Sequence, residues 1–291
     1  MTTPSLSPWA NGHSIEVLRS VSAGLQADVQ DYEATPVNAD GVAAEWVLAN
    51  GVSTTAPVVA YFHGGAYLCG TPQQYRNATV WLSRLARVRV LAVDYALAPE
   101  HPHPSAFENA LSVYQWLLAQ LPTPAKIILA GDSAGASIAI TLAADALALG
   151  LPLPAALLTN SPFADLALAS ASLDDPALNE NEPNKTTIQW LAKTYLQAGP
   201  GPGLDACDPR HSPIYRDLTG LPPLLIQTAG KDNLRDDGIR LARKARECGV
   251  TTVHTDYARS GHIWIVTEPA DKSPHSLQAL QEMVTFANGV L

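Results

Sequence analysis

Short apolar runs alternate with amphipathic stretches along most of the chain. Runs typical of buried strands cover residues 58–62, 88–93, 127–130, 155–159, 224–228 and 251–257. Apolar residues at helical spacing predict helices over residues 74–86, 105–120, 137–149, 236–248 and 276–288. Because strands that alternate with helices usually pair in parallel, the pattern predicts an α/β fold with a central, mostly parallel sheet flanked by helices.

Two further strand-like runs lie ahead of this alternation, at residues 35–37 and 42–48, on either side of the pair Asp40-Gly41. An Asp-Gly pair between apolar runs favours a tight hairpin turn. We therefore expect these two runs to add an antiparallel edge to the sheet.

Two segments interrupt the alternation. Residues 163–215 carry repeated prolines around one amphipathic stretch, residues 185–196, which predicts a helical insertion rather than sheet. The N-terminal segment places Trp9, Ile15, Leu18, Val21 and Leu25 at roughly helical spacing. We expect a single domain over residues 1–291, in which residues 1–34 and the insertion at 163–215 form a cap above the carboxyl edge of the sheet.

The composition fits a globular protein with a large core, since 47% of the 291 residues are apolar and 15% are charged. A net charge of −9 without a basic stripe argues against a nucleic-acid partner. The longest apolar stretches, such as residues 142–151, are interrupted by Asp145 and Gly150 and are too short to span a bilayer. No membrane span is expected.

Cysteine usage and the N-terminal segment bear on the compartment. Cys69, Cys207 and Cys248 form neither an even set nor a Cys-x-x-Cys pair, which predicts free thiols in a reducing compartment. No lysine or arginine precedes Arg19, and no apolar run of signal-peptide length occurs in the first thirty residues. These features predict a cytoplasmic location.

The sequence Gly131-Asp132-Ser133-Ala134-Gly135 follows an apolar run and precedes a helical stretch. This order of strand, sharp turn and helix is that of a nucleophile elbow, in which a strained turn exposes a serine. Side chains two positions on either side of Ser133 would collide with their neighbours, and Gly131 and Gly135 remove those collisions. Ordinary glycine-rich turns share the Gly-x-Ser-x-Gly pattern, so the rest of the chain must decide.

A nucleophilic serine needs a base, and the position of His262 suits that role. His262 follows the last predicted strand and precedes the last predicted helix, where a loop can hold its imidazole over Ser133. His254 lies inside a predicted strand, and His101 and His103 lie among prolines. A lone loop histidine is more often a solvated surface residue, but the upstream Ser133 favours a catalytic His262.

The base in turn needs a carboxylate to fix its tautomer and stabilise the imidazolium. Asp232 ends the predicted strand before the histidine strand. Asp236 and Asp237 begin a predicted helix, where capping and the helix dipole explain them. The resulting order, Ser133, Asp232 and His262, is that of α/β-hydrolases.

Backbone N–H groups must also face the oxygen on which negative charge develops. His63-Gly64-Gly65-Ala66 follows the strand-like run at 58–62, and its glycines let the backbone approach a ligand closely. We assign the donors to Gly65, Ala66 and Ala134, with Gly64 as a further candidate, and expect His63 to brace the loop by hydrogen bonding. No His-Glu-x-x-His or comparable spacing occurs, so neither a metal nor a cofactor is expected.

The chain resembles the hormone-sensitive-lipase branch of the α/β-hydrolases, the bacterial family IV esterases. The resemblance extends from about residue 58 to the C-terminus and rests on His-Gly-Gly at 63–65, Asp-Tyr-x-Leu-Ala-Pro-Glu at 94–100, Gly-Asp-Ser-Ala-Gly at 131–135, Asp232-x-Leu234-x-Asp236 and Gly261-His262. It implies the α/β-hydrolase fold and makes Tyr95 and Glu100 supports of the oxyanion loop. Where the family usually has a third glycine, an arginine and a proline, this chain has Ala66, Ala96 and Asn233. Ala66 keeps its amide, whereas Ala96 removes a buttressing charge.

Together these residues predict a serine carboxylesterase that acts through an acyl-enzyme on a small-molecule ester. The resemblance implies short- to medium-chain acyl groups and leaves a homodimer open, because family members are often dimers. Trp190, Leu191, Tyr195 and Trp264 either line an apolar pocket or pack in the core. The same machinery also serves an amidase such as aryl formamidase, a lactonase or an acyltransferase. A non-catalytic small-molecule receptor is less favoured, because all three catalytic candidates are present.

Overall fold

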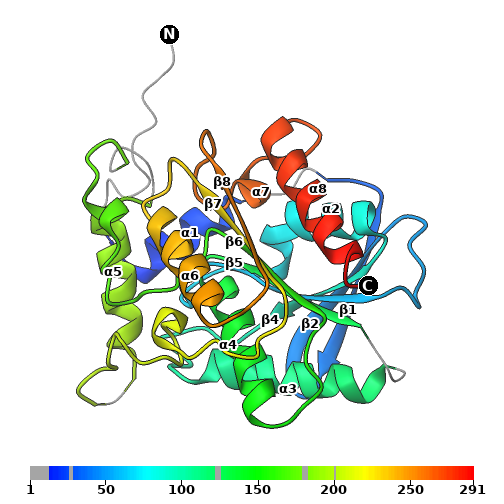
Figure 1. Cartoon of the computed structure of the whole chain (residues 1–291), viewed down its shortest axis with the longest axis horizontal. Helices are drawn as coiled ribbons and strands as arrows, with labels where there is room; N and C mark the ends of the chain where they lie inside the picture. The colour runs from blue at the N-terminus through cyan, green and yellow to red at the C-terminus, as the bar shows by residue number, and fades with distance from the viewer. Residues whose placement is uncertain (1–12, 26–28, 122–125, 179–182, 200) are drawn as a thin grey trace.

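The computed structural model describes residues 13–25, 29–121, 126–178, 183–199 and 201–291. Within these residues one eight-stranded sheet has the strand order β1-β2-β4-β3-β5-β6-β7-β8 (Figure 1). Its strands are β1 (Tyr32–Ala39), β2 (Val42–Ala49), β3 (Val58–Phe62), β4 (Arg89–Asp94), β5 (Ile127–Asp132), β6 (Ala156–Asn160), β7 (Leu224–Ala229) and β8 (Thr252–Tyr257). Strand β2 pairs antiparallel with β1 and β4, and all other neighbours are parallel. The expected α/β architecture and antiparallel edge are therefore confirmed.

The helices cover both faces of the sheet and one end of it. They are α1 (Ile15–Ala23), α2 (Arg76–Ala86), α3 (Ser105–Gln120), α4 (Ala134–Ala148), α5 (Lys185–Leu196), α6 (Arg235–Glu247), α7 (Trp264–Thr267) and α8 (Pro274–Asn288), with short 3₁₀ turns η1 (Pro72–Tyr75), η2 (Ala171–Asp174) and η3 (Pro213–Tyr215). Figure 1 shows α1 and α5 together at one end, away from α2 and α8. None of the helices in the described ranges is long and apolar enough to cross a membrane.

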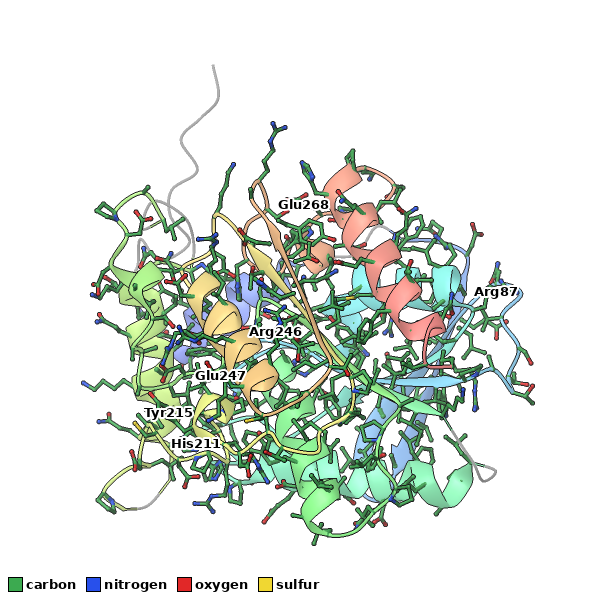
Figure 2. The ribbon with its side chains drawn as sticks, in the orientation of Figure 1. Arg87, His211, Tyr215, Arg246, Glu247 and Glu268 are labelled. Atoms are coloured by element: carbon green, nitrogen blue, oxygen red, sulfur yellow. The ribbon has the colours of Figure 1, made fainter. Side chains whose placement is uncertain are left out.

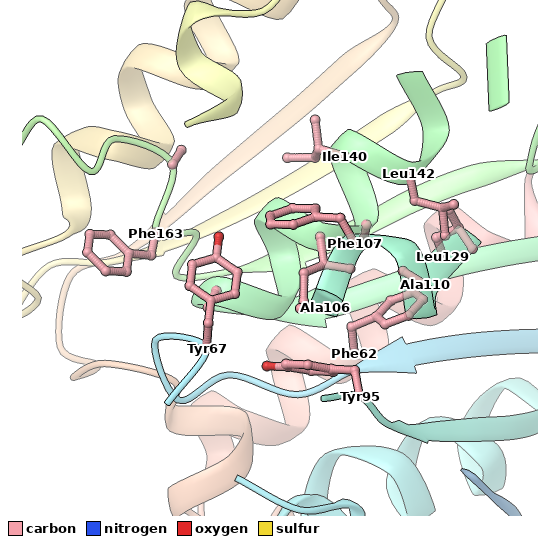
Figure 3. Packing of buried hydrophobic residues seen from close by; sticks show 14 of the residues in the cluster. Phe62, Tyr67, Tyr95, Ala106, Phe107, Ala110, Leu129, Ile140, Leu142 and Phe163 are labelled. Carbon is pink, nitrogen blue, oxygen red and sulfur yellow. The ribbon is translucent and has the colours of Figure 1, made fainter. Parts of the chain in front are cut away.

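Alternation along the buried strands divides the core between the two faces. In β3, Val58, Ala60 and Phe62 pack with residues of α3 and α4, whereas Val59 and Tyr61 pack with residues of α2 and α8. Figure 3 shows part of the first group, with Phe62 beside α3 side chains such as Ala110. Strands buried on both faces explain the continuous apolar runs in the sequence.

The first hairpin forms where the sequence predicts it. Asp40 and Gly41 have φ values of 54° and 87°, the left-handed region that a tight turn between paired strands requires. The amide of Gly41 donates a hydrogen bond of 2.6 Å to the side chain of Asn38. Because β1 begins at Tyr32, the last three residues of the expected N-terminal cap segment belong to the sheet instead.

Two helices differ from the expectations in an instructive way. Helix α4 begins at Ala134, three residues before the predicted start at 137. The whole turn is made at Ser133, so Ala134 and Gly135 are already helical. Helix α7 was not predicted, since a helix of four residues is too short to show a period. The insertion is helical at α5, as expected, and its later part lies against α6. Lys244 of α6 donates a hydrogen bond to the carbonyl of Ile214, and η3, which ends at Tyr215, contacts α6 (Figure 2).

Candidate active site

Ser133 occupies the sharp turn between β5 and α4. Its φ of 51° lies in the left-handed region that non-glycine residues seldom adopt, and the residue is only 5% exposed. A Cβ on Gly131 would lie 2.5 Å from the backbone of Gly135, and one on Gly135 would overlap the carbonyl of Phe62. The two glycines are therefore required by close backbone packing, as the sequence predicts.

The three side chains predicted to be catalytic come together from separate loops. Nε2 of His262 lies 3.2 Å from Oγ of Ser133, and Nδ1 of His262 lies 2.8 Å from Oδ2 of Asp232. Asp232 is buried, and its other oxygen accepts a hydrogen bond of 2.9 Å from the amide of Leu234. This arrangement lets a proton pass from the hydroxyl to the imidazole while the carboxylate holds the ring in place.

The surroundings of His262 favour the protonated form of its imidazole. Burial opposes the charge on His262, but the Asp232 carboxylate and its hydrogen bond outweigh burial and raise the pKa of His262 above its ordinary value. The carboxyl of Asp132 adds to the same effect. The imidazolium that forms during proton transfer is thereby stabilised.

Asp132, next to the nucleophile, is itself an unusual buried acid. It is fully buried, and the hydroxyl of Tyr61 donates a 2.6 Å hydrogen bond to Oδ1. Burial raises the pKa of Asp132 to about 7, despite this hydrogen bond and the nearby charge of His262. Its protonation state therefore changes close to neutral pH.

The predicted oxyanion donors lie on what we call the glycine loop, residues 63–69, and at the start of α4. Gly65 and Ala66 line a cavity together with Ser133, and neither amide donates to an acceptor among the described residues. The amide of Ala134, as the first residue of α4, has no partner within the helix. The backbone of Gly64, by contrast, acts to lower the pKa of the Asp132 carboxyl.

His63 and Tyr95 support the glycine loop through hydrogen bonds and ring stacking, as expected. A ring nitrogen of His63 lies 2.7 Å from the carbonyl of Gly64, and the hydroxyl of Tyr95 donates a 2.7 Å hydrogen bond to the carbonyl of His63. The His63 and Tyr95 rings stack, with 4.2 Å between their centroids. Burial lowers the pKa of His63 to about 4, so this ring is neutral and braces the loop rather than exchanging protons.

A cavity of about 240 Å³ opens at Ser133 and His262. Its walls are largely apolar and come from α1, the glycine loop, α5 and the loops around Asp232 and His262; they include Leu18, Val21, Leu25, Cys69, Tyr75, Phe163, Pro183, Ile188, Leu191, Leu234 and Ile263. Such a site holds an apolar group beside a few polar atoms that fix its orientation.

Only one of the four apolar residues singled out in the sequence lines this cavity, and that is Leu191. Tyr195 and Trp264 pack in the core, and Trp190 contacts the ring of His13. The choice between pocket and core depends on which way each side chain faces in the folded chain, which helical spacing alone does not give.

The segments expected to form a cap contact each other and the site. Nε2 of His13 lies 3.2 Å from the Thr187 hydroxyl of α5, and Leu18 of α1 and Ile188 of α5 line the same cavity. The side chain of Asn233 donates to the carbonyls of Leu178 and Pro183, at 3.0 and 3.1 Å. Asn233, which replaces the family's usual proline, thus joins the Asp232 loop to the insertion. Trp9, also expected in the cap, lies outside the described residues.

Several functional contacts were missed in the sequence. Ser161 holds the loop after His262, and Cys69, Tyr75 and Phe163 line the cavity. They carry no recognisable motif, and only their distance from Ser133 in the fold reveals them. Cys69, Cys207 and Cys248 are free thiols, as expected, and the described residues hold no cluster of side chains suited to a metal ion.

Comparison with known proteins finds the same fold over most of the chain. Residues 59–266 match a family described as alpha/beta hydrolase fold. The chain is 37% identical over 221 residues to an acetyl-hydrolase of Streptomyces hygroscopicus, a match that covers 76% of this chain and 72% of that protein. It is 36% identical over 261 residues to an esterase of Acinetobacter venetianus, covering 88% of this chain and 82% of the other.

Solved structures agree over nearly the full length. An esterase from the bacterial hormone-sensitive lipase family aligns with a TM-score of 0.85 at 30% identity, covering 99% of this chain and 93% of the other. An esterase/lipase from an uncultured bacterium aligns with a TM-score of 0.86 at 31% identity, covering 99% and 94%.

Proposed function

Because this chain belongs to the α/β-hydrolase family, we propose that it is a serine carboxylesterase that hydrolyses short- to medium-chain acyl esters through an acyl-enzyme. The observation that carries the proposal is the relay from Asp232 Oδ2 to His262 Nδ1 at 2.8 Å and from His262 Nε2 to Ser133 Oγ at 3.2 Å. The apolar cavity beside Ser133 gives the acyl group of such an ester a place to bind.

In the first half of the reaction, Oγ of Ser133 attacks the ester carbonyl while Nε2 of His262 takes its proton. The carbonyl oxygen becomes negative and accepts hydrogen bonds from the amides of Gly65, Ala66 and Ala134. The intermediate then collapses: the bond to the alcohol oxygen breaks, His262 gives that oxygen its proton, and the acyl group stays on Ser133.

In the second half, water takes the place of the alcohol. His262 accepts a proton from the water as the water oxygen attacks the acyl carbonyl, and the same amides hold the oxyanion. Collapse of this second intermediate breaks the bond to Ser133 Oγ, and His262 returns the proton to that oxygen. The products are a carboxylic acid, an alcohol and the free enzyme.

The size and lining of the cavity support a preference for compact acyl groups. A volume of about 240 Å³ is at the small end for ligand sites and fits a short chain better than a long one. The walls from α1 and α5 would cover the bound acyl chain, and we propose that these two segments act as a cap. The ring contact between His13 and Trp190, with centroids 5.5 Å apart, supports their acting together.

The decisive experiment combines a substrate panel with a probe of the nucleophile. Purified protein is assayed on p-nitrophenyl acetate and butyrate, on lactones and on aryl amides, and its serine is labelled with a fluorophosphonate. We expect hydrolysis of the two esters and labelling of the wild type but not of Ser133→Ala. Faster cleavage of amides or lactones than of esters would contradict the proposal, and an unlabelled wild type would favour a receptor. The homodimer and the cytoplasmic location stay predictions.

A further inference from the structure

One arginine of α1 binds two of the loops that shape the site. Nη1 and Nη2 of Arg19 contact the two carboxylate oxygens of Glu100, at 2.7 and 2.6 Å. Nε of Arg19 donates to the carbonyl of Leu68 at 3.1 Å, and Nη2 also donates to the carbonyl of Ala98 at 3.2 Å. A guanidinium has the planar set of donors that such a combination of carboxylate and carbonyls needs.

The two carbonyls belong to segments that meet beside the predicted oxyanion donors. Leu68 lies in the turn of the glycine loop, where its own amide donates to the carbonyl of Gly65 at 2.9 Å. The amide of Ala98 donates to the carbonyl of Tyr67, also at 2.9 Å. Arg19 therefore binds the glycine loop and the segment of residues 94–100 at the point where they are joined.

This part of the glycine loop has a conformation that its neighbours must maintain. Ala66 and Tyr67 have φ values of 53° and 64°, which cost free energy for residues with a Cβ. The Tyr67 ring stacks on Tyr195 with 4.4 Å between centroids, and its centroid lies 5.7 Å from that of Phe107 (Figure 3). The ring is thus held by packing, while the backbone after it is held through Leu68 and Ala98.

The same helix that carries Arg19 forms one wall of the cavity. Leu18, Val21 and Ser22 of α1 line the cavity, and the Ser22 hydroxyl also donates to Gln74 at 2.9 Å. Arg19 is adjacent to Leu18 in the chain, so one side chain ties this wall to the loop that faces Ser133. The family's usual arginine at position 96 is alanine here, and Arg19 supplies the guanidinium that binds Glu100.

We propose that Arg19 is a positioning residue that fixes the α1 wall relative to the glycine loop and thereby sets the preference among acyl chain lengths. This inference rests on the proposed esterase function. An acetyl group is small enough to be held by the loop beside Ser133. A longer chain extends along Leu18 and Val21, so it depends on where α1 lies.

Arg19 and Glu100 both stay charged, so their ion pair persists over the pH range of an assay. The hydrogen bonds from Arg19 lower the pKa of Glu100 to about 2, so the carboxylate remains ionised at any pH used to assay an esterase. Both side chains are partly exposed, 37% for Arg19 and 54% for Glu100, so salt weakens their attraction. The two carbonyl contacts add directional hydrogen bonds to that attraction.

The test compares Arg19→Gln with the wild type on p-nitrophenyl acetate, butyrate and hexanoate. We expect kcat/KM to fall about tenfold more for hexanoate than for acetate, with the extra loss mainly in KM, because the wall binds the chain without taking part in the chemistry. Glu100→Gln should change the preference in the same direction but less, since the carbonyl contacts remain. The double variant should equal Arg19→Gln if the two residues act as one unit.

Arg210→Gln is the matched control. Arg210 also binds a carboxylate through two nitrogens, at 3.1 and 2.6 Å from Asp208, but it is 61% exposed and does not line the cavity. We expect its chain-length preference to equal that of the wild type. Equal losses on all three esters in Arg19→Gln, or a profile like that of Arg210→Gln, would overturn the proposal. If Arg19→Gln does not fold, Glu100→Gln decides by the same criterion.

A second measurement does not depend on catalysis. Amide hydrogen exchange should be faster in Arg19→Gln than in the wild type over residues 13–25 and at the amides of Leu68 and Ala98, and unchanged there in Arg210→Gln. Unchanged exchange at these positions would overturn the coupling. If the wild type hydrolyses no ester, the proposed function fails, and exchange alone still tests whether Arg19 joins the two elements.

Discussion

The hydroxyl of Ser161 accepts a hydrogen bond of 3.3 Å from the amide of Ile263, the residue that follows His262. Both residues have left-handed backbone angles, with φ of 45° at Ser161 and 46° at Ile263. Since a β-branched residue rarely holds such an angle, the contact between them fixes the loop that carries the imidazole of His262, the proposed base.

Ser161→Ala removes the acceptor for the Ile263 amide. We expect kcat to fall about tenfold with little change in KM, because a small misplacement of His262 affects proton transfer more than binding. Steady-state kinetics on p-nitrophenyl butyrate measures the split. An unchanged kcat would show that the loop holds its shape without this hydrogen bond.

Asp232→Asn tests whether Asp232, rather than a neighbouring carboxylate, is the one that acts with His262. The variant keeps the volume of the side chain but loses the charge that orients and stabilises the imidazolium, so we expect kcat to fall by about 10² to 10⁴. Asp236→Asn is the control, because Asp236 contacts the amide of Ser172 rather than His262. A larger loss in Asp236→Asn than in Asp232→Asn would mean that the wrong carboxylate was assigned.

The pH dependence of kcat/KM follows from the state of His262 in the free enzyme. The imidazole must be neutral to take the serine proton, and its pKa is raised above the ordinary 6.5 by Asp232 acting against burial. Activity should therefore fall as the pH drops, with a midpoint above 6.5. Burial raises the pKa of Asp132 to about 7, so this carboxyl titrates in the same range and contributes to the same fall in kcat/KM at acid pH.

Asp132→Asn tests how far Asp132 contributes to the acid side of the pH profile. Loss of the nearby negative charge removes one cause of the raised pKa of His262, so the acid limb should move to lower pH. The full rate profile from pH 5 to 9 is compared with that of the wild type. An identical midpoint in both proteins would show that Asp132 does not influence the base.

The free energy of unfolding should depend on pH through Asp237, a fully buried carboxyl of α6 that contacts the start of the insertion. It accepts hydrogen bonds from the amides of Ala164 and Asp165, at 2.9 and 3.0 Å, and from the Ser170 hydroxyl. Burial raises the pKa of Asp237 from 3.8 to about 7. Between these values the native state keeps a proton that the unfolded state has lost, so the free energy of unfolding falls as the pH rises.

Asn at position 237 resembles the protonated acid but does not titrate, so Asp237→Asn removes this pH dependence of the free energy of unfolding. Relative to the wild type, its free energy of unfolding should rise by a few kcal/mol between about pH 4 and pH 7, since one pKa unit corresponds to about 1.4 kcal/mol. Urea unfolding at pH 4.5, 6 and 7.5 measures the change, with Asp236→Asn as the control that keeps the carboxyl at 237. A constant difference across this range would contradict the prediction.

Asn233→Ala tests the proposed cap. The change removes the two hydrogen bonds to Leu178 and Pro183, and Pro183 lines the cavity. We expect a several-fold higher KM for p-nitrophenyl butyrate with kcat within about twofold of the wild type, because Asp232 itself is untouched. A loss confined to kcat would instead mean that Asn233 positions Asp232 rather than the insertion.

The sequence by itself determined the order of elements and singled out the residues that lie together at the candidate site. Alternating apolar runs and the Gly131 to Gly135 motif are local patterns, set by the period of a strand or helix and by the steric demands of one turn. The positions of Ser133, Asp232 and His262 after strand ends predict that the three side chains meet, because parallel strands place their carboxyl ends at one edge of the sheet.

The tertiary structure alone decided which distant side chains meet. Arg19 reaches Glu100 across 81 positions, and Ser161 reaches Ile263 across 102. Leu191 faces the cavity while Trp264 turns into the core, although both are apolar residues near the site. Such contacts depend on the packing of whole elements against each other, which is fixed by long-range burial and leaves no period or motif in the chain.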